Sequence, residues 1–303
     1  MTATLQAVGL SKRFGSAVAL SGFDLEVGAG EIVGLVGHNG AGKTTFARSV
    51  VGLVGLDAGF VLVRGLDASR RPARTRPLIG LAPQELALYP TATARENLHL
   101  FAGLYGVRRA DARRRIAQLG EQLVLTEVLD RRVRELSGGQ QRRLQAATAM
   151  LHLPAVLLLD EPTVGADPVT RDALLGAVRA AAEHGAAVIY TTHYLPELDT
   201  LRATLAVADH GRIVARGERA SLLAVVPGQA VLEFDSPPPQ LAAPLDGQLD
   251  VRRSERRLTI TAPDPAAALV PLLAAHPEAA ARLRSIELHP PTLDDLYRHL
   301  VGP

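Results

Sequence analysis

The sequence GHNGAGKTT spans Gly37–Thr45 and directly follows a short apolar run at Glu31–Val36. The pattern G-x4-G-K-T, between a predicted buried strand and a predicted helix, is typical of a phosphate-binding loop. Its glycines let backbone N–H groups converge on phosphate oxygens, and the start of the helix adds partial positive charge. We expect Lys43 to reach the terminal phosphates of a nucleotide and Thr44 to bind Mg²⁺. The predicted nucleotide contacts in this loop are Gly37, Asn39, Gly40, Gly42, Lys43, Thr44 and Thr45.

A second motif, VLLLDEP, occupies Val156–Pro162. Its apolar run predicts a buried parallel strand, which would present Asp160 and Glu161 at its carboxyl end, where such sheets bind ligands. We expect Asp160 to hold Mg²⁺ and Glu161 to polarise the attacking water as a general base. Two solvated acids at a strand end are the plainer interpretation, but the phosphate loop upstream favours a catalytic magnesium site.

Between these motifs lies LSGGQ, at Leu136–Gln140, directly before a predicted helix over 140–150. A serine and two glycines at a helix start make a second anion-binding position, although both residue types are also ordinary helix caps. We find one phosphate loop in the chain, so a second phosphate position requires a second nucleotide. Two-fold pairing, with each LSGGQ closing on the partner's ATP, is the simplest arrangement.

These motifs, in this order, resemble the ATP-binding cassette (ABC) family over roughly Leu5–Leu223. The resemblance implies that the chain is an ATPase that uses ATP and Mg²⁺. It implies that Gln84 senses the γ-phosphate and Mg²⁺ and faces a membrane partner, and that His193 is a switch histidine on the γ-phosphate. The nucleotide contacts that it implies in the signature are Ser137, Gly138, Gly139 and Gln140. The metal ligands that it implies are Thr44, Gln84 and Asp160.

Two further positions take a role from the same resemblance. Val164–Asp167 matches the loop that crosses the dimer interface, with Asp167 near the nucleotide, and Phe14 matches the aromatic residue that stacks on adenine. Taken alone, a histidine after a strand is more often structural, and a single phenylalanine is most often a core residue. The chain departs mildly from the family pattern, with Ala166 where leucine is common and Phe14 where tyrosine is common.

The predicted fold is α/β: a P-loop NTPase ABC cassette with an antiparallel N-terminal sheet and a helical subdomain, followed by a small α+β domain. We expect the cassette at residues 1–227, with the helical subdomain at about 90–139. In that insertion, Thr93 and Glu96 form a T-x-x-E capping pattern. The accessory domain is expected at 228–303, where strand-like runs alternate with two helical segments, the last one beginning at Thr292.

Composition limits the remaining possibilities. The chain has no cysteine, so disulfides and thiolate metal sites are excluded, and a net charge of +2 is too balanced to indicate a nucleic-acid partner. No run reaches the roughly 18 apolar residues that a membrane-spanning helix needs. The ABC resemblance implies a peripheral protein at the cytoplasmic face of the cell membrane, held there by a separate membrane-spanning permease subunit.

The segment from Tyr89 to Gly106 and the C-terminal sequence PPTLDDLYRHLVG resemble ATPase subunits of bacterial drug and antibiotic exporters of the daunorubicin-resistance type. The implied function is ATP hydrolysis that drives export of a drug, antibiotic or lipid-like compound. A soluble ABC ATPase acting on DNA or ribosomes, or an import-system ATPase, is the alternative. The sequence names neither the substrate nor the permease, leaves homodimer and heterodimer both open, and assigns no role to the accessory domain.

Overall fold

The computed structural model describes residues 3–237 and 250–301. The chain forms two compact units, Met1–Gly217 and Glu218–Pro303. This division precedes the expected boundary after residue 227, because the short helix α8 (Arg219–Leu223) packs with the C-terminal helix α11 (Leu293–Val301) of the second unit. Among the described residues, no helix is long and apolar enough to cross a membrane.

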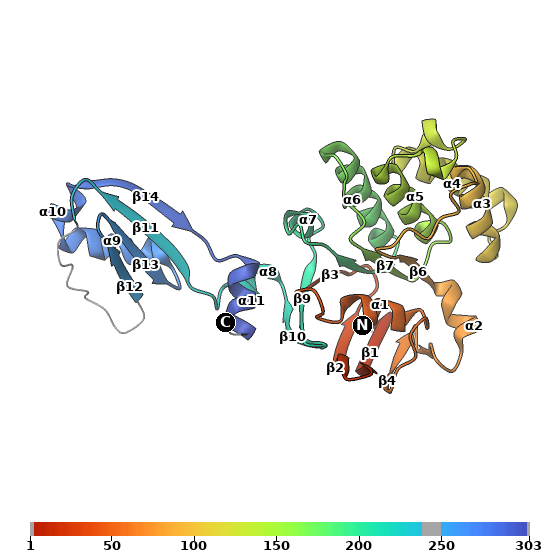
Figure 1. Cartoon of the computed structure of the whole chain (residues 1–303), viewed down its shortest axis with the longest axis horizontal. Helices are drawn as coiled ribbons and strands as arrows, with labels where there is room; N and C mark the ends of the chain where they lie inside the picture. Colours follow the sequence, from red (N-terminus) through yellow and green to blue (C-terminus); the bar gives the residue numbers. More distant parts are fainter. Residues whose placement is uncertain (1–2, 238–249, 302–303) are drawn as a thin grey trace. The chain divides into compact units, whose positions relative to one another are not determined.

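A six-stranded sheet with the order β10-β9-β3-β8-β7-β6 forms the centre of the first unit, as far as the structure describes it (Figure 1). The parallel strands are β3 (Ile32–Val36), β6 (Ile79–Ala82), β7 (Val156–Asp160), β8 (Ala187–Thr191) and β9 (Thr204–Asp209), and β10 (Arg212–Gly217) is antiparallel to β9. Every residue of β3, β7 and β8 is buried. Burial on both faces explains why these strands are continuous apolar runs in the sequence.

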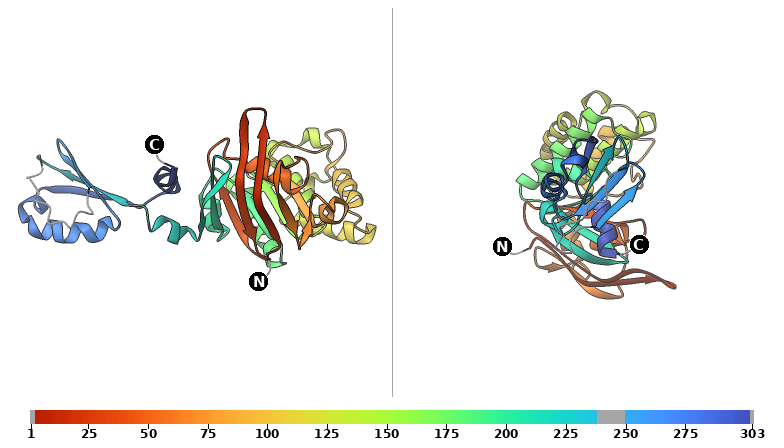
Figure 2. Two further views of the ribbon diagram at one scale, coloured as in Figure 1. Left: turned by 90° about the horizontal axis from the view of Figure 1, so that it is seen from below. Right: turned by 90° about the vertical axis from the view of Figure 1, so that its left-hand side faces the viewer.

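An antiparallel sheet with the order β2-β1-β4-β5 lies against one side of this centre (Figures 1 and 2). Its strands are β1 (Leu5–Phe14), β2 (Ala17–Val27), β4 (Ala58–Val63) and β5 (Leu66–Asp67). Helix α1 (Lys43–Val50) packs between the two sheets, where Phe46 stacks on Phe23 with ring centroids 4.8 Å apart. The expected N-terminal antiparallel sheet is therefore present, and its core holds the helix that follows the phosphate loop.

Two helices, α5 (Gly138–Met150) and α6 (Pro168–Glu183), pack on the other face of the central sheet (Figure 1). Helices α3 (Ala94–Leu104) and α4 (Arg109–Gln122) pack on α5 and α6, and shorter helices occur at α2 (Pro72–Thr75) and α7 (Pro196–Thr200). The predicted capping box is confirmed, because Glu96 N donates to Thr93 Oγ1 at 3.1 Å and Thr93 N donates to Glu96 Oε2 at 2.7 Å. An isolated β-bridge pairs Thr93 with Arg132 and joins the two ends of the helical insertion.

The second unit is a small α+β fold. Its described strands, β11 (Gly228–Phe234), β12 (Asp250–Ser254), β13 (Arg257–Ala262) and β14 (Leu283–His289), form an antiparallel sheet with the order β12-β13-β11-β14. Helix α9 (Pro265–Ala275) runs along one face of this sheet, followed by α10 (Pro277–Ala280) (Figure 2). Leu269 and Leu272 of α9 pack on Leu232, Phe234 and Ile260 of the sheet, so this unit has its own core.

Candidate functional site

Four predicted site segments follow the carboxyl ends of neighbouring parallel strands. The phosphate loop follows β3, Gln84 follows β6, Asp160 ends β7, and His193 follows β8. The strand register places Asp160 opposite Thr191 and Leu159 opposite Ala82. Since β3, β8, β7 and β6 are adjacent in the sheet, their carboxyl ends meet at one edge, which is the ligand-binding edge of such folds.

The phosphate loop closes tightly on its surroundings. Gly42 has a φ of +99°, and a Cβ there would lie 2.6 Å from the backbone oxygen of Ala19, so only glycine fits. Gly42 is also the N-cap of α1 and supplies no side-chain cap. No side chain caps the first N–H groups of the helix, so these groups can donate hydrogen bonds to a bound anion.

Lys43 is the first residue of α1, and its ammonium group turns back over the loop. Nζ donates to the backbone oxygens of Gly37 at 2.6 Å and His38 at 3.0 Å. Burial lowers the pKa of Lys43, while the nearby carboxylates of Asp160 and Glu161 act in the opposite direction. The ammonium is thus held close to both acids at the mouth of the loop.

A cavity of about 400 Å³ lies above this loop. Its lining comprises residues 17–19 of β2, residues 39–45 of the phosphate loop, Gln84, Asp160 and Glu161. Six of the seven nucleotide contacts predicted in the phosphate loop thus line the cavity, and Gly37 is the one that does not. The volume of the cavity falls within the range of ordinary ligand pockets.

Oxygen donors gather at the floor of the cavity. The Thr44 hydroxyl donates to Asp160 Oδ2 at 3.2 Å, and the Thr191 hydroxyl donates to Asp160 Oδ1 at 2.5 Å. Asp160 is only 5% exposed, and these two hydrogen bonds, one from α1 and one from β8, hold the orientation of its carboxylate. A hydroxyl and a carboxylate in this arrangement are a donor set that fits Mg²⁺, which prefers hard oxygen ligands. Sequence reasoning missed Thr191, which could have been found as the polar end of a buried strand.

Glu161 lies between His193, the predicted switch histidine, and Gln84, the predicted sensor of the γ-phosphate. His193 Nε2 is 2.6 Å from Glu161 Oε1, and Gln84 Nε2 donates to Glu161 Oε2 at 3.4 Å. Glu161 has a φ of +50°, which is rare for a residue with a side chain. Its backbone N–H donates to the hydroxyl and carbonyl oxygens of Thr191, at 3.0 and 3.2 Å, which holds this conformation. These contacts hold the Glu161 carboxylate in the lining of the cavity, between His193 and Gln84.

A buried polar cluster below His193 was not predicted from the sequence. Glu197 of α7 is 1% exposed and accepts hydrogen bonds from the hydroxyls of Tyr190 at 3.0 Å and Thr192 at 2.7 Å. Arg171 Nε of α6 lies 3.3 Å from Glu197 Oε1, an ion pair without hydrogen-bond geometry. Burial, followed by the charge of Glu197, raises the pKa of Tyr190. The cluster ties the histidine loop to the helix that begins after Asp167.

We expect Glu197→Ala to lower the free energy of unfolding by about 3 kcal/mol, because it leaves a half-buried Arg171 and two buried hydroxyls without their acceptor. Urea titration followed by circular dichroism measures this loss. Glu183→Ala, at the exposed end of the same helix α6, is the matched control and should change stability by less than about 0.5 kcal/mol. Equal effects of the two substitutions would contradict a structural role for the cluster.

The signature segment lies outside the cavity. Ser137 caps α5: its hydroxyl accepts from Gln140 N at 3.3 Å, and its N–H donates to Gln140 Oε1 at 2.9 Å. None of the described residues that line the cavity comes from Ser137, Gly138, Gly139 or Gln140. A Cβ on Gly139 would lie 3.4 Å from the oxygen of Gly165, so the signature adjoins the predicted interface loop. Within one chain, the predicted signature contacts are therefore not brought to the phosphate loop.

Asp167 and Phe14 also lie apart from the cavity lining. Asp167 caps α6 by accepting from Thr170 N at 3.1 Å, and hydrogen bonds from Thr170 lower its pKa. Phe14, at the end of β1, is 53% exposed, and the ammonium of Lys12 lies 5.5 Å from its ring centroid. An exposed aromatic ring is free to stack on a base, in contrast to the core position that a lone phenylalanine usually takes.

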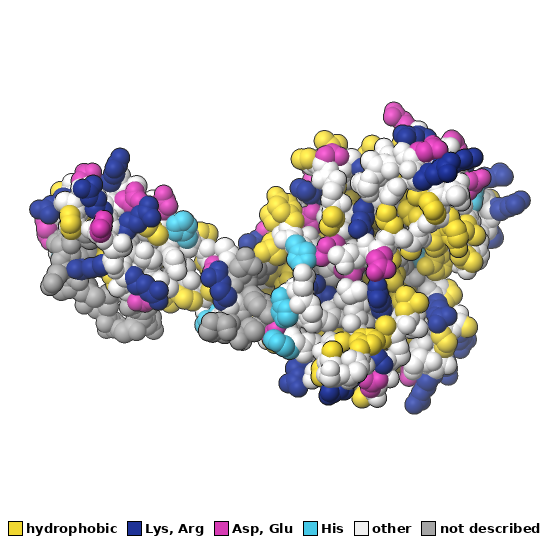
Figure 3. Space-filling model, in the orientation of Figure 1, with side chains coloured by type: hydrophobic (Ala, Val, Ile, Leu, Met, Phe, Trp, Pro, Cys, Tyr) yellow, Lys and Arg dark blue, Asp and Glu magenta, His cyan; other side chains and the backbone are white. Residues whose placement is uncertain are grey.

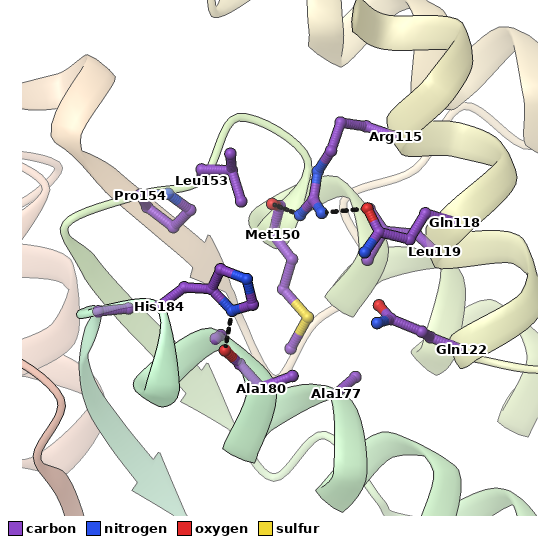
Figure 4. Close-up of a pocket in the computed structure, with 12 residues that line it drawn as sticks. Arg115, Gln118, Leu119, Gln122, Met150, Leu153, Pro154, Ala177, Ala180 and His184 are labelled. Carbon is purple, nitrogen blue, oxygen red and sulfur yellow. Dashed lines mark hydrogen bonds between the residues drawn. The ribbon is translucent and has the colours of Figure 1, made fainter.

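A second cavity of about 60 Å³ lies between α4, α5 and α6 (Figure 4). Arg115 points into it and donates to the oxygens of Met150 at 3.2 Å and Gln118 at 2.7 Å, while His184 contacts the oxygen of Ala180. Its volume suits a few water molecules and not a nucleotide. It contains none of the predicted site residues, so the strand-end cavity is the functional candidate.

Comparisons with known proteins agree with this geometry. A family model described as ABC transporter matches residues 20–164. The chain is 38% identical to daunorubicin resistance ATP-binding protein DrrA2 of Streptomyces coeruleorubidus, over 98% of this chain and 95% of that protein. It is 34% identical to linearmycin resistance ATP-binding protein LnrL of Bacillus subtilis, over 98% of both. The Nod factor export ATP-binding protein I of Rhizobium is 36% identical, over 97% of this chain and 95% of that protein.

Solved structures give the same result. The ATP binding subunit of an ABC transporter superposes with a TM-score of 0.69 and 28% identity, covering 73% of this chain and 92% of that chain. A nucleotide-free ATP-binding cassette superposes with a TM-score of 0.61 at 23% identity, which shows the shared fold. The expected cassette fold is therefore confirmed.

Proposed function

Because this chain belongs to the ABC transporter family as an ATP-binding subunit, we propose that its ATPase activity drives a separate membrane-spanning subunit that exports a drug, an antibiotic or a lipid-like compound. One observation carries the ATPase assignment: Lys43, Thr44, Asp160, Glu161 and His193 meet at one edge of the parallel sheet. The relatives named for resistance or export, matched along nearly their whole length, support the export assignment.

Each site residue has a proposed role in hydrolysis. The uncapped start of α1 and Lys43 would hold the phosphates, and Phe14 would stack on the base. Thr44, Asp160 and Gln84 would hold Mg²⁺, which neutralises phosphate charge when it is bound. Glu161 would accept the proton of the attacking water, and His193 would orient Glu161 and contact the γ-phosphate.

We propose that the working form pairs two cassettes head to tail. The signature start of α5 lies outside this chain's own cavity, yet it has the serine, glycines and helix terminus of an anion site. In a two-fold pair, Ser137 and Gly139 of one subunit would meet the nucleotide on the other. Since these contacts exist only in the closed pair, ATP would favour closure by differential binding. The argument holds equally for a homodimer and for a heterodimer with a related cassette.

The proposed contact surface for the permease surrounds the segment after β6. Figure 3 shows hydrophobic side chains gathered over α3 and this segment. Leu86, Tyr89, Leu100 and Leu104 are 44%, 54%, 42% and 70% exposed. An apolar patch of this kind marks a protein contact. Because Gln84 begins this segment and donates to Glu161, the patch is linked directly to the catalytic carboxylate. The protein would then sit at the cytoplasmic face of the membrane.

Export is favoured over the two alternatives. An ATPase acting on DNA or ribosomes would need a nucleic-acid surface, whereas this chain has a net charge of +2 and an apolar patch beside Gln84. An import ATPase would share the cassette chemistry, but the relatives described above are resistance and export proteins.

Purification from detergent-solubilised native membranes tests the proposal. We expect an apolar, multi-spanning polypeptide to copurify in stoichiometric amount with the wild-type chain. Leu104→Asp should lower its recovery severalfold, because it puts a charge in the proposed contact. Leu53→Asp is the matched control, since Leu53 is also 70% exposed and lies outside the patch. Recovery only in the soluble fraction, together with ribosomal or DNA-repair proteins, would contradict the export proposal and leave the ATPase chemistry standing.

A further inference from the structure

Two histidines and an aspartate meet where the phosphate loop touches the β9–β10 turn. They are His38, in the loop after β3, and Asp209 and His210, at the turn. One ligand atom from each of the three lies within 4.8 Å of those of the other two, and among the described residues this is the one group of three such side chains that could hold a metal ion. Figure 3 shows histidine side chains gathered over β9 and β10. The ATPase chemistry described above uses none of the three.

The hydrogen bonds of His38 match those of a metal-binding imidazole. Nδ1 lies 2.5 Å from the backbone oxygen of Asn39, and Nε2 lies 3.0 Å from Asp209 Oδ1. Both neighbouring groups are oxygen acceptors and a neutral ring has one N–H, so in the tautomer with the proton on Nδ1 the ring donates to Asn39 and the Nε2 lone pair faces the carboxylate. A cation between Nε2 and Asp209 would satisfy both lone pairs, and a backbone carbonyl on the other ring nitrogen is the usual second contact of a metal-binding histidine.

Asp209 sits at the centre of the group. Its other oxygen, Oδ2, lies 2.8 Å from His210 Nδ1. The carboxylate is 11% exposed, whereas the side chains of His38 and His210 are 39% and 80% exposed. The donor set therefore has a fixed anionic centre and two imidazoles that can rotate to the roughly 3.3 Å donor spacing that zinc–nitrogen bonds of about 2 Å require.

The backbone holds the three positions in place. Gly211 N donates to Ala41 O at 3.2 Å, and Ser21 N donates to Gly211 O at 2.9 Å, so the turn is fastened to both the phosphate loop and β2. His210 has a φ of +42° in a two-residue turn, a position where asparagine is the favoured residue with a side chain. His210 therefore occupies a left-handed turn position, which histidine, like asparagine and aspartate, adopts more readily than most residues with a side chain.

We propose that His38, Asp209 and His210 bind a zinc ion, or a similar first-row divalent cation, with water completing the coordination. Two imidazoles and one carboxylate suit zinc, nickel or copper, whereas Mg²⁺ prefers the hydroxyl and carboxylate oxygens at Thr44 and Asp160. The ligand types at the two sites therefore favour different cations, a first-row transition metal at the histidines and Mg²⁺ at Thr44 and Asp160. A bound cation ties the phosphate loop to the β9–β10 turn and stabilises the nucleotide-free loop.

The test is calorimetric titration of tag-free, nucleotide-free protein with ZnCl₂, with circular dichroism as a check on folding. We expect one zinc per chain and a rise in Tm. His210→Asn retains the turn and should weaken the affinity by about 10- to 100-fold or more, as should His38→Gln. His184→Asn, at the exposed C-cap of α6, is the matched control and should bind zinc as the wild type does.

Substituting cobalt for zinc gives a second readout that does not depend on ATPase activity. The visible absorption of cobalt bound to three protein ligands should appear in the wild type and disappear in His210→Asn, while MgCl₂ should compete weakly. No saturable zinc binding, or equal affinity in wild type and both variants, would overturn the proposal. In that case the two histidines serve only as hydrogen-bond partners of Asp209.

Discussion

Glu161→Gln is expected to lower the ATPase turnover number by about 10²- to 10⁴-fold while nucleotide binding is retained. The amide keeps the size of the side chain and can still contact Gln84 and His193, but it cannot accept a proton from the attacking water. Steady-state phosphate release measures the loss. Fluorescent-nucleotide binding in the same samples should give a Kd within a few-fold of the wild type.

The same variant reports on pairing. If ATP closes two cassettes and hydrolysis reopens them, blocked hydrolysis should make MgATP-dependent dimers accumulate in light scattering. Glu183→Gln makes the same chemical change at an exposed position on α6 and should leave turnover unaltered. Normal turnover by Glu161→Gln would remove Glu161 from the proposed mechanism. If Glu161→Gln lost turnover but remained a monomer with MgATP, the result would contradict the head-to-tail pairing and leave the catalytic role of Glu161 standing.

Lys43→Ala is expected to raise the Kd for ATP by about 10- to 100-fold, since one charge-assisted interaction with phosphate contributes about 1.5–3 kcal/mol. The substitution also removes the hydrogen bonds from Nζ to Gly37 and His38, so thermal unfolding should be measured in parallel. Lys43→Arg keeps the charge but puts a larger group in a half-buried position, and we expect an intermediate Kd.

The control for this charge change is Arg109→Ala, which removes an exposed cation at the start of α4. It should leave the Kd for ATP unchanged. An unaltered Kd in folded Lys43→Ala would mean that the phosphate-loop assignment is wrong. A higher Kd in both variants would instead indicate a general effect of net charge.

Much of this protein could be predicted from local sequence. The loop Gly37–Thr45 was identified by glycine spacing between an apolar run and a helix, and the structure has that strand, loop and helix. Strand β7 was identified because burial on both faces requires four apolar residues before Asp160. The cap formed by Thr93 and Glu96 was visible because it depends on residues only three positions apart.

Tertiary structure decided the contacts between distant segments. His38 and Asp209 are 171 residues apart, and Thr44 and Asp160 are 116 apart, yet parallel strand order brings each pair within hydrogen-bond distance. The ion pair of Arg171 with the buried Glu197 gives no sequence signal, because neither residue belongs to a motif. Caps and turns can be predicted from the sequence because they depend on neighbouring residues. The site at the carboxyl ends of the parallel strands depends instead on which strands lie side by side. That order is set by burying the apolar faces of the whole sheet, a property of the entire unit and of no single segment.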